Sequence, residues 1–419
     1  MLSTFKNAWR IPELRKKIMF TMVVLLAYRV ANAVSVPYLA PDAASTMREF
    51  MSGTVLDWMN MMSGLGLANG SLLALGIQPY INSSIIVQLL TVAIPALERL
   101  AKDGGEEGKK KINQITRITT LALGVLMGIG AYSILAGKNL LTEAGFLPGL
   151  VIVGALTAGS CIVMWMGEQI TEHGIGNGIS MILFANIIAG LPTMFRKLAL
   201  FTTWWQTALV ALGLLALIVL IVFINDAERR IPIQYAKRVV GRKVYGGQNT
   251  NLPIKVAMSG VMPVIFAQTI AMIPGTIYQF GSIEPGWWYE HIWNPSGWLY
   301  AIVYALLIFF FSWFYSQIQY DPVEISNNLK KNGGFIPGFR PGKPTGDFIK
   351  KVIGKIVIFG AVYLTIVALL PMIAGMALPA VSSLAIGGTS IIIVVSVALE
   401  TVKALEAQML MRHYKGFLD

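Results

Sequence analysis

Charged side chains are scarce in this chain of 419 residues: Asp, Glu, Lys and Arg make up 13% of it, whereas hydrophobic residues make up 55%. Together with a mean hydropathy of +0.64, this composition excludes an ordinary soluble protein. The single cysteine, Cys161, excludes a disulfide framework. The three histidines, His173, His291 and His413, are far apart in the sequence, so no metal site is expected. The chain has no G-x-x-x-x-G-K-S/T loop for phosphates, and no cofactor is expected.

The sequence instead contains long runs of apolar residues. A hydrocarbon core about 30 Å thick is crossed by a helix of roughly 20 apolar residues. On that criterion the sequence predicts an all-α integral membrane protein with ten transmembrane helices. The predicted segments are 18–37, 71–94, 115–136, 148–170, 178–195, 204–224, 254–277, 297–318, 353–374 and 377–399. The first is expected to be a retained signal-anchor, because it is too long for the apolar region of a cleaved signal peptide.

Basic residues divide unequally between alternate loops. If the N-terminus is cytoplasmic, the cytoplasmic segments hold 28 of the 33 Lys and Arg residues, the opposite side holds four, and Arg29 lies inside the first segment. Cytoplasmic loops of membrane proteins carry such an excess of positive charge. Ten crossings then place both termini in the cytoplasm.

Ten segments divide into two sets of five near residue 200. Because five crossings reverse the direction of a second copy, residues 1–200 and 201–419 are expected to form two pseudo-symmetric halves in inverted orientation. The halves share no convincing sequence identity, so ten helices without internal symmetry remain an alternative.

The run from Ser71 to Leu90, SLLALGIQPYINSSIIVQLL, has membrane length but contains glycine, proline, amides and hydroxyls. Polar or irregular backbone at membrane depth is tolerated only where it is buried in protein or lines a water-filled cavity. This segment is therefore predicted to line a path through the protein. The preceding stretch, Gly53–Gly70, is too short and glycine-rich to span but carries apolar side chains. A short re-entrant helix is predicted there, with a helix lying on the outer leaflet as the alternative.

Two cytoplasmic loops, 227–255 and 319–352, are long, basic and rich in turn residues. The first is predicted to form a hairpin about Val239–Val244 with Gly246 and Gly247 near its turn. Such loops suit docking to an acidic partner, such as ribosomal RNA or an acidic protein face, whereas a role in topology alone would explain their charge but not their length. The N-terminal residues 2–17 are predicted to form an interfacial amphipathic helix.

Few ionisable residues lie deep in the predicted segments: Arg29 does, Glu168 lies near a segment end, and Glu400 directly follows the last segment. Intramembrane ionisable groups mark ion or proton routes, so their scarcity weakens an ion-coupled transporter as the function. Aliphatic segments with a few amides suit a gate that closes by excluding water.

Two long motifs are similar to those of a known family. Residues 76–88 read G-I-x-P-Y-I-x-x-S-I-I-x-Q, and residues 168–178 read E-x-I-T-x-x-G-I-G-N-G, where the glycines are typical of a tight helical hairpin. With RRIPIQYAKR at 229–238 and PGFRPG at 337–342, they resemble the SecY/Sec61α family of protein-translocation channels over essentially the whole chain. The resemblance implies a channel that passes unfolded secretory polypeptides across the bacterial cytoplasmic membrane and releases transmembrane segments sideways into it.

The resemblance also implies roles for individual residues. A pore ring of aliphatic side chains would comprise Ile81, Ile85, Leu183, Ile187, Ile265 and Ile393, in which Leu183 departs from the usual isoleucine. A plug at about 53–66 would include Asp57, Trp58, Met59, Met61 and Met62. A lateral gate would use Gln88 and Gln268, and partner docking would use Arg238, Arg242, Lys243, Phe339 and Arg340.

The partners implied by the resemblance are SecE-like and SecG-like small membrane subunits, the SecA motor ATPase, the ribosome with its RNA, signal sequences and unfolded preproteins. Membrane lipid surrounds the channel. Two other functions are alternatives. A secondary transporter for a small solute would need a convergent polar site at mid-membrane, and an enzyme would need a Ser/His pair, an Asp pair or a metal cluster; the sequence offers little for either. The chain is therefore expected to be a conduit and no enzyme.

Overall fold

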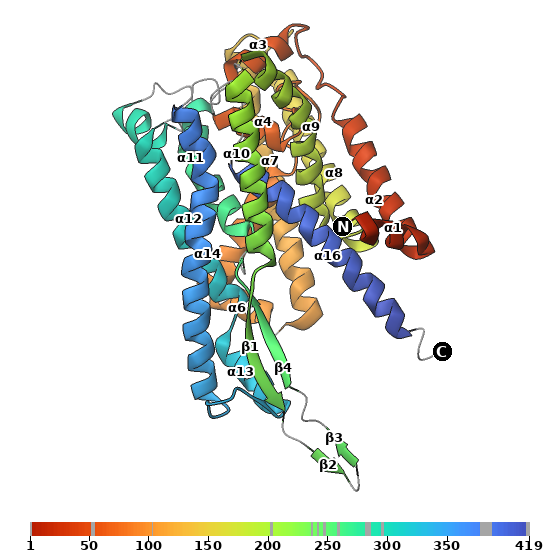
Figure 1. Ribbon diagram of the computed structural model, residues 1–419. Coiled ribbons are helices and arrows are strands. Elements are labelled where there is room, and N and C mark those ends of the chain that lie inside the picture. Colours follow the sequence, from red (N-terminus) through yellow and green to blue (C-terminus); the bar gives the residue numbers. More distant parts are fainter. Residues whose placement is uncertain are drawn as a thin grey trace.

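Each of the ten predicted membrane segments contains a helix, and these helices stand side by side in a bundle (Figure 1). The computed structural model describes residues 2–51, 55–102, 104–201, 204–235, 238–240, 243–245, 249–257, 260–280, 286–294, 297–377 and 388–415. The helices that match the predicted segments are α2 (Pro12–Ala31), α5 (Gln78–Ala93), α7 (Gly105–Gly137), α8 (Phe146–His173), α9 (Gly178–Phe201), α10 (Trp204–Asp226), α11 (Met262–Phe280), α12 (Trp298–Gln319), α14 (Lys343–Ala377) and α16 (Gly388–Lys415).

Shorter elements connect the long helices. They are α1 (Leu2–Arg10), α3 (Ala43–Met51), α4 (Val55–Met62), α6 (Pro95–Lys102), η1, a π-helical turn (Tyr289–Trp293), and α13 (Pro322–Lys331). Within the described residues, α7, α8, α10, α12 and α14 are each long and apolar enough to cross a membrane, and α5 joined to α6 by a 106° bend is a sixth candidate. α9 and α11 are shorter apolar helices. The architecture is that of an all-α membrane protein, and the count of ten crossings stays a prediction.

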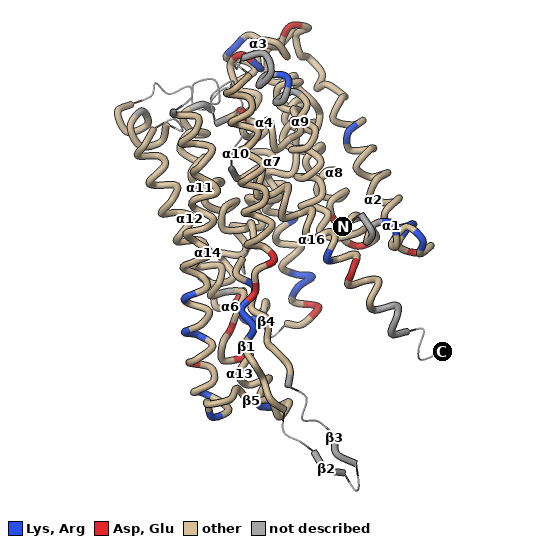
Figure 2. The backbone as a smooth tube through the Cα atoms, viewed as in Figure 1, with Lys and Arg blue, Asp and Glu red and all other residues tan. Residues whose placement is uncertain are grey.

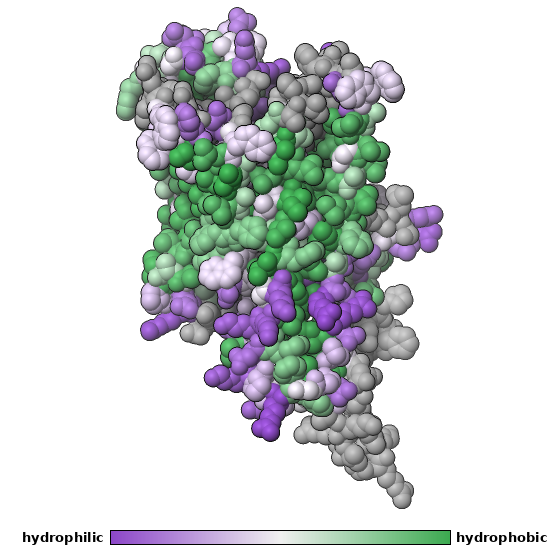
Figure 3. All heavy atoms as spheres, turned by 60° about the vertical axis from the view of Figure 1, so that its left-hand side comes forward, coloured by the Kyte–Doolittle hydropathy of each residue, from purple (hydrophilic) through white to green (hydrophobic). Residues whose placement is uncertain are grey.

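Side chains divide along the bundle as a membrane requires. Apolar residues form a broad band around the middle of the molecule, and hydrophilic residues gather toward both ends (Figure 3). Many large apolar side chains face outward within that band, such as Leu212 and Phe223 on α10, each 73% exposed. Most Lys and Arg lie at the end that carries the β-hairpin, which agrees with a cytoplasmic location for that end (Figure 2).

The helices pack in two groups that meet at the centre. α8 lies against α2, α7 and α9, and α5 lies against α7, whereas α12 lies against α11 and α14. α16 contacts α9 as well as α10 and α14, and α7 contacts α11, so these two contacts join the groups. The symmetry between residues 1–200 and 201–419 stays a prediction.

The two long basic loops carry the strands. β1 (Glu228–Tyr235) pairs antiparallel with β4 (Asn249–Lys255), Ile231 opposite Leu252, and with the short β5 (Gly334–Phe335). The apolar face of this sheet is buried against α13 and α14, where Ile231, Ile233 and Ile254 meet Leu329 and Ile349. Both long loops therefore fold into one structure at the end of α14.

The predicted hairpin exists, but its turn was placed wrongly. β2 (Arg238–Val240) pairs with β3 (Lys243–Tyr245), and Val240 lies opposite Lys243, so two residues connect the strands. Two-residue connections are the commonest in hairpins. Gly246 and Gly247 lie outside the described residues.

Four predicted boundaries were also wrong. The interfacial helix 2–17 is two helices, because Pro12 cannot donate to the preceding turn and begins α2 instead. α2 ends at Ala31 rather than 37, and α5 begins at Gln78 rather than 71, because residues 71–77 form turns. α11 begins at Met262 rather than 254, because residues 254–255 belong to β4.

Candidate functional site

The start of α5 brings the first candidate ring residues to the centre of the bundle. Gly76 adopts φ +54°, a left-handed conformation that favours glycine, and a Cβ there would lie 3.3 Å from the Cα of Ser63. Pro79 then occupies the first turn of α5, where its missing N–H costs no helical hydrogen bond. The chain thus enters α5 in mid-bundle, and Ile81 and Ile85 follow on successive turns.

Six aliphatic side chains from four helices meet at this point. Leu183 and Ile187 of α9 and Ile393 of α16 belong to one buried cluster and are 3%, 1% and 2% exposed. Ile85 of α5 belongs to a second cluster, formed mostly by α10 to α16. Ile81 and Ile265, on α5 and α11, pack against both clusters and join them. The six candidate ring residues are therefore brought together; their role as a ring stays a proposal.

A seventh aliphatic residue, Ile179, lies beside these six and was not predicted from the sequence motifs. Ile179 lies one helical turn before Leu183 on α9 and packs against the same cluster. Its spacing of four residues from Leu183, and of eight from Ile187, is the signal that would have found it. The aliphatic surface of α9 therefore extends over three turns.

The re-entrant helix predicted at Gly53–Gly70 is α4, and it lies inside the protein. Leu56, Met59 and Met62 are buried, and α4 contacts α9 and α11. Met62 belongs to the cluster that holds Leu183, Ile187 and Ile393, and Trp58 and Met61 pack against it. A helix lying on the outer leaflet would not have these contacts, so that alternative is wrong.

Residues 60–68, which we call the anchored turn, comprise the last three residues of α4 and the six that follow it, and their own polar groups bond them together. The Asn60 carbonyl accepts from Leu65 N at 2.8 Å and from Ser63 Oγ at 2.9 Å. Asn60 Oδ1 accepts from Ala68 N at 2.9 Å, and Ser63 Oγ accepts from Leu67 N at 3.2 Å. The anchored turn is therefore a small, internally bonded unit.

Side chains of α2 and α9 hold this unit from outside. On α2, Arg29 Nη1 donates to the Gly64 carbonyl at 2.9 Å, and Asn32 Nδ2 lies 3.1 Å from both the Ser63 and the Gly64 carbonyl oxygens. The Tyr28 hydroxyl reaches the Ser63 carbonyl at 3.3 Å, and on α9 Asn186 Nδ2 donates to the Met62 carbonyl at 2.7 Å. The sequence did not reveal these partners. An arginine and two asparagines within membrane-length segments were the available signal.

A cavity of about 470 Å³ opens where α5 and α7 face α11, beside Met59 of α4. Gln78, Asn82 and Thr269 line it, and each has one buried side-chain oxygen without a hydrogen-bond partner. Gln88 and Gln268, the predicted gate pair, are half-buried on α5 and α11. Within the described part of the chain no hydrogen bond joins their amides, so their pairing stays a prediction.

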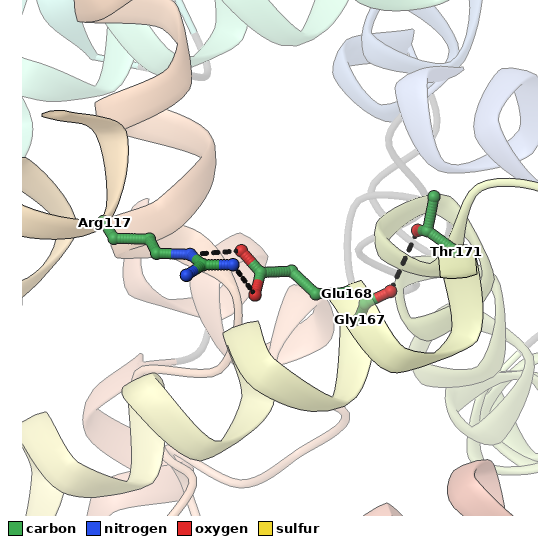
Figure 4. A network of polar contacts seen from close by, with 4 residues as sticks. All are labelled: Arg117, Gly167, Glu168 and Thr171. Atoms are coloured by element: carbon green, nitrogen blue, oxygen red, sulfur yellow. Dashed lines mark hydrogen bonds and ion pairs between the residues drawn. The ribbon is translucent and has the colours of Figure 1, made fainter. Parts of the chain in front are cut away.

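An ion pair joins α7 to Glu168, the first residue of the second motif, on α8. Arg117 of α7 donates from Nε and Nη2 to the two carboxylate oxygens of Glu168 on α8, at 2.9 and 2.8 Å (Figure 4). One turn further along α8, Thr171 Oγ1 donates to the Gly167 carbonyl at 2.9 Å and accepts from Gly178 N, also at 2.9 Å. A Cβ on Gly178 would collide with the Gly167 carbonyl, which explains the glycine in this tight hairpin.

The docking residues lie at the basic end of the molecule. Arg340 is exposed beside Phe339, which is 38% exposed and whose ring lies 4.3 Å from that of Phe348. Arg238 and Lys243 belong to β2 and β3, whereas Arg242 lies outside the described residues. Thr345 Oγ1 donates to the Arg340 carbonyl at 2.8 Å and so fixes the backbone of this loop at the start of α14.

Among the described residues, no group of three or more His, Cys, Asp or Glu side chains is placed to hold a metal ion. What the centre of the molecule offers is an aliphatic constriction, a short buried helix against it and a polar seam beside it. An aliphatic surface of this kind excludes water where it closes.

The comparisons with known proteins agree with one another. A family model described as SecY matches residues 71–402. Curated proteins named protein translocase subunit SecY are 40% identical over 438 residues in Streptomyces galbus, 41% over 440 in Corynebacterium glutamicum and 39% over 444 in Mycobacterium tuberculosis. In each case the match covers 100% of this chain and 100% of the relative.

Solved structures share the fold at lower sequence identity. A protein-conducting channel superposes with a TM-score of 0.67 at 17% identity, covering 96% of both chains. A SecY whose plug domain is described as stabilising the closed state and maintaining a membrane seal gives 0.65 at 18%, again over 96% of both. Sec61 in the canine ribosome–channel complex gives 0.61 at 15%, also over 96% of both. At these identities the likeness concerns the fold alone.

Proposed function

Because the chain belongs to the SecY family, we propose that it is the protein-conducting subunit of a channel that passes unfolded polypeptides across the bacterial cytoplasmic membrane. The observation that carries the proposal is the convergence of Ile81, Leu183, Ile187, Ile265 and Ile393 from four helices against α4. A narrow aliphatic constriction excludes water and ions. It also deforms around a passing chain without binding any one sequence, because apolar contacts are non-directional.

The closed state has two seals in this proposal. The aliphatic ring, with Ile85 as its sixth member, forms the first. α4 forms the second as a plug, in which Trp58, Met61 and Met62 pack against the cluster of ring residues, Met59 packs in the neighbouring cluster and the half-buried Asp57 lies in the first turn. Opening requires α4 to leave.

The seam between α5 and α11 is the proposed lateral gate. A transmembrane segment of the passing polypeptide would leave the channel sideways there, and Gln88 and Gln268 are the proposed gate residues. Support comes from the cavity beside α4, where buried polar atoms of Gln78, Asn82 and Thr269 have no partner. An unpaired buried polar atom weakens the contact between two surfaces, which suits a seam that must separate.

The N-terminus, C-terminus and both basic loops are proposed to be cytoplasmic. The curated relatives are named as subunits, and the channel is accordingly proposed to assemble with SecE-like and SecG-like small membrane proteins. Arg238, Arg242, Lys243, Phe339 and Arg340 are proposed to receive a SecA motor or a ribosome. The chain itself would be a passive conduit without enzymatic activity, and the partner would supply the energy.

The test of this function is single-channel conductance in planar bilayers. The intact purified complex would be compared with a variant that lacks Thr54–Leu65. We expect the intact complex to be silent and the deletion to leak ions. If both are silent and the protein binds a small solute tightly, the function is that of a solute transporter. If both are silent without such binding, either the ring alone seals the channel or residues 54–65 are not the plug. The same deletion tests the plug without depending on any partner.

A further inference from the structure

We propose that residues 286–294 and 297–298, which we call the aromatic segment, rest in the outer interface of the lipid bilayer and anchor α11 and α12 there. The segment comprises η1, the residues that flank it and the first residue of α12. Lipid covers it, with acyl chains beneath the rings and ester and headgroup oxygens at their polar edges. This anchoring is independent of the proposed function and applies whatever the chain transports.

Tryptophan is concentrated in the aromatic segment. Four of the ten tryptophans in the chain lie there: Trp287, Trp288, Trp293 and Trp298. The segment has no Lys or Arg, and Glu290 is its one acidic residue. Without positive charge it has nothing to attract an acidic protein or a nucleic acid. Tryptophan and tyrosine gather instead at membrane–water interfaces, because each ring is apolar with one polar edge.

The segment lies at the end of the bundle opposite the strands, which we call the outer end (Figure 1). α12 begins at Trp298 and ends at Gln319, shortly before α13, which packs with the sheet. The first residue of α12 therefore lies at the outer end, and η1 contacts both α11 and α12. On this side of the molecule the apolar band gives way to hydrophilic residues toward the outer end (Figure 3).

The exposed face of α12 continues from the aromatic segment into the apolar band. Four side chains that recur every four residues are each more than half exposed: Trp298, Ile302, Leu306 and Phe310. Residues four apart lie on the same face of a helix, so these four form one stripe along α12. A stripe of this kind in a membrane protein faces lipid. Because Trp298 is its outermost member, the same lipid reaches the aromatic segment.

The exposed indoles have requirements that an interface meets. Trp287, Trp288 and Trp298 are 62%, 66% and 65% exposed, and within the described residues their indole N–H groups donate no hydrogen bond. In water this much exposed apolar ring is unfavourable. In hydrocarbon the N–H would lack an acceptor. At the interface, acyl chains contact the ring while lipid oxygens accept from the N–H.

The rings are held in place by the segment itself. Trp287 stacks on His291 with ring centroids 4.8 Å apart and meets Trp288 edge-on at 5.4 Å. His291 Nδ1 lies 3.0 Å from the Trp287 carbonyl oxygen. The half-buried Tyr289 packs against Tyr278 of α11, with ring centroids 4.7 Å apart. Since η1 also contacts α12, a force on the exposed indoles is passed to both helices.

Anchoring at this place fixes the depth of one wall of the candidate site. Interfacial tryptophans set the depth and tilt of the helix that carries them. α11 carries Ile265 of the aliphatic set and lines the polar cavity with Thr269. The position of both residues along the membrane normal therefore depends on how the aromatic segment meets the outer leaflet.

The depth of the segment can be measured with a spin label. In a Cys161→Ala background, a nitroxide is attached in turn to Trp288→Cys, Phe310→Cys and Val323→Cys. The whole complex is placed in liposomes of phosphatidylethanolamine and phosphatidylglycerol. Relaxation of the label by oxygen, which concentrates among acyl chains, is compared with relaxation by a nickel chelate that stays in water. Phe310 represents the apolar band, and the exposed Val323 of α13 represents water.

We expect the ratio of oxygen to nickel accessibility at position 288 to lie between those at positions 310 and 323. A ratio equal to that at 323 places the segment in water and overturns the proposal. A ratio equal to that at 310 places it in hydrocarbon and overturns it too. Low accessibility to both reagents means that protein covers the rings, which overturns lipid as the occupant.

A second measurement tests whether the indoles anchor α12. The label is attached to Leu299→Cys, in the first turn of α12, and Trp287→Ala with Trp288→Ala is added. The matched control adds Trp204→Ala with Trp205→Ala, which removes an exposed tryptophan pair from the start of α10. We expect the accessibility ratio at position 299 to change by about twofold or more with the first pair and to stay the same with the second.

An unchanged ratio with the first pair, or an equal change with both pairs, overturns the anchor. If the alanine pair does not assemble into the complex, Trp287→Phe with Trp288→Phe is measured in its place. These phenylalanines keep an apolar ring and remove the N–H, so the ratio at position 299 is again expected to change, and an unchanged ratio overturns the anchor.

Discussion

Arg117 of α7 and Glu168 of α8 neutralise each other through two parallel hydrogen bonds, at 2.9 and 2.8 Å. Both charges also act on the hydroxyl of Tyr80, which precedes the ring residue Ile81 on α5. The carbonyl of Thr116, next to Arg117, accepts from the buried Ser83 Oγ of α5 at 2.7 Å. The pair thus connects α7 and α8 beside the start of the constriction, and its loss would loosen the group of α5, α7 and α8.

The first prediction concerns this pair. Arg117→Glu would place two carboxylates side by side, and we expect it to lower the free energy of unfolding by roughly 1 kcal/mol, the upper range for partly exposed pairs. The reversed pair, Arg117→Glu with Glu168→Arg, is expected to recover most of that loss. Thermal unfolding of the purified complex in detergent measures both. A reversed pair less stable than either single variant would show that the surroundings, and not the pair, set the stability.

The second prediction concerns Gly64. Gly64→Ala would force a side chain into the left-handed region and against Arg29 and Asn186, at a cost of about 1–3 kcal/mol. We expect a lower unfolding temperature and a measurable ion leak through the resting channel. Gly213→Ala on α10 is the matched control, because a Cβ there meets nothing within 4 Å. It should be neutral or stabilising by about 0.5–1 kcal/mol. If the two variants have the same unfolding temperature and the same ion leak, the close approach at Gly64 contributes neither to stability nor to closure.

Much of the helical framework followed from the sequence, because a membrane demands long apolar runs and places basic loops on one side. The start of α2 was missed since Glu13 and Arg15 hide it in a hydropathy pattern, and the start of α5 was missed since residues 71–77 are apolar yet form turns around Gly76. Apolar composition does not distinguish a helix from a buried turn. Here the positive φ of Gly76 marks the turn, and this conformation depends on the neighbouring residues that the backbone approaches.

The candidate site, like the fold, could be predicted only in part from the sequence. The candidate ring residues could be named from the resemblance to a known family, although only Ile81 and Ile85 lie inside one of the long motifs. The support of the plug could not, because Arg29 and Gly64 are 35 residues apart and the acceptor is a backbone carbonyl, which carries no sequence signal. Arg29 was noticed as an unusual charge in a membrane segment, but its partner is defined only by the fold.

The third prediction concerns Arg340, which is exposed on a loop whose backbone is fixed by Thr345. Arg340→Glu reverses a charge that the proposed docking surface presents to an acidic partner, and we expect impaired preprotein export with normal amounts of channel in the membrane. Lys351→Glu makes the same change of charge at an exposed position nearby on α14 and is expected to have the smaller effect. Normal export by the Arg340 variant would remove this residue from the docking surface.

The fourth prediction concerns the lateral gate. If the amides of Gln88 and Gln268 satisfy each other in the closed seam, Gln268→Leu leaves Gln88 without a partner and weakens closure. The variant is then expected to accept precursors with less hydrophobic signal sequences than the parent chain does. Gln169→Leu, at a half-buried position on α8, is the control. Export measured with a graded series of signal sequences gives the comparison, and an unchanged preference would mean that the amides do not hold the seam.

The fifth prediction concerns the constriction itself. Ile393 is 2% exposed among aliphatic side chains of α5, α9 and α11, and Ile393→Asn would give water a hydrogen-bonding group inside the ring. A wetted constriction conducts ions, so we expect current through the resting complex in planar bilayers. Val367→Asn buries the same amide in the cluster of α10 to α16, where Val367 of α14 is 0% exposed, and should destabilise the protein without opening a conducting path. Equal conductance in the two variants would show that current follows general loosening, and Ile393 would then have no special place in the seal.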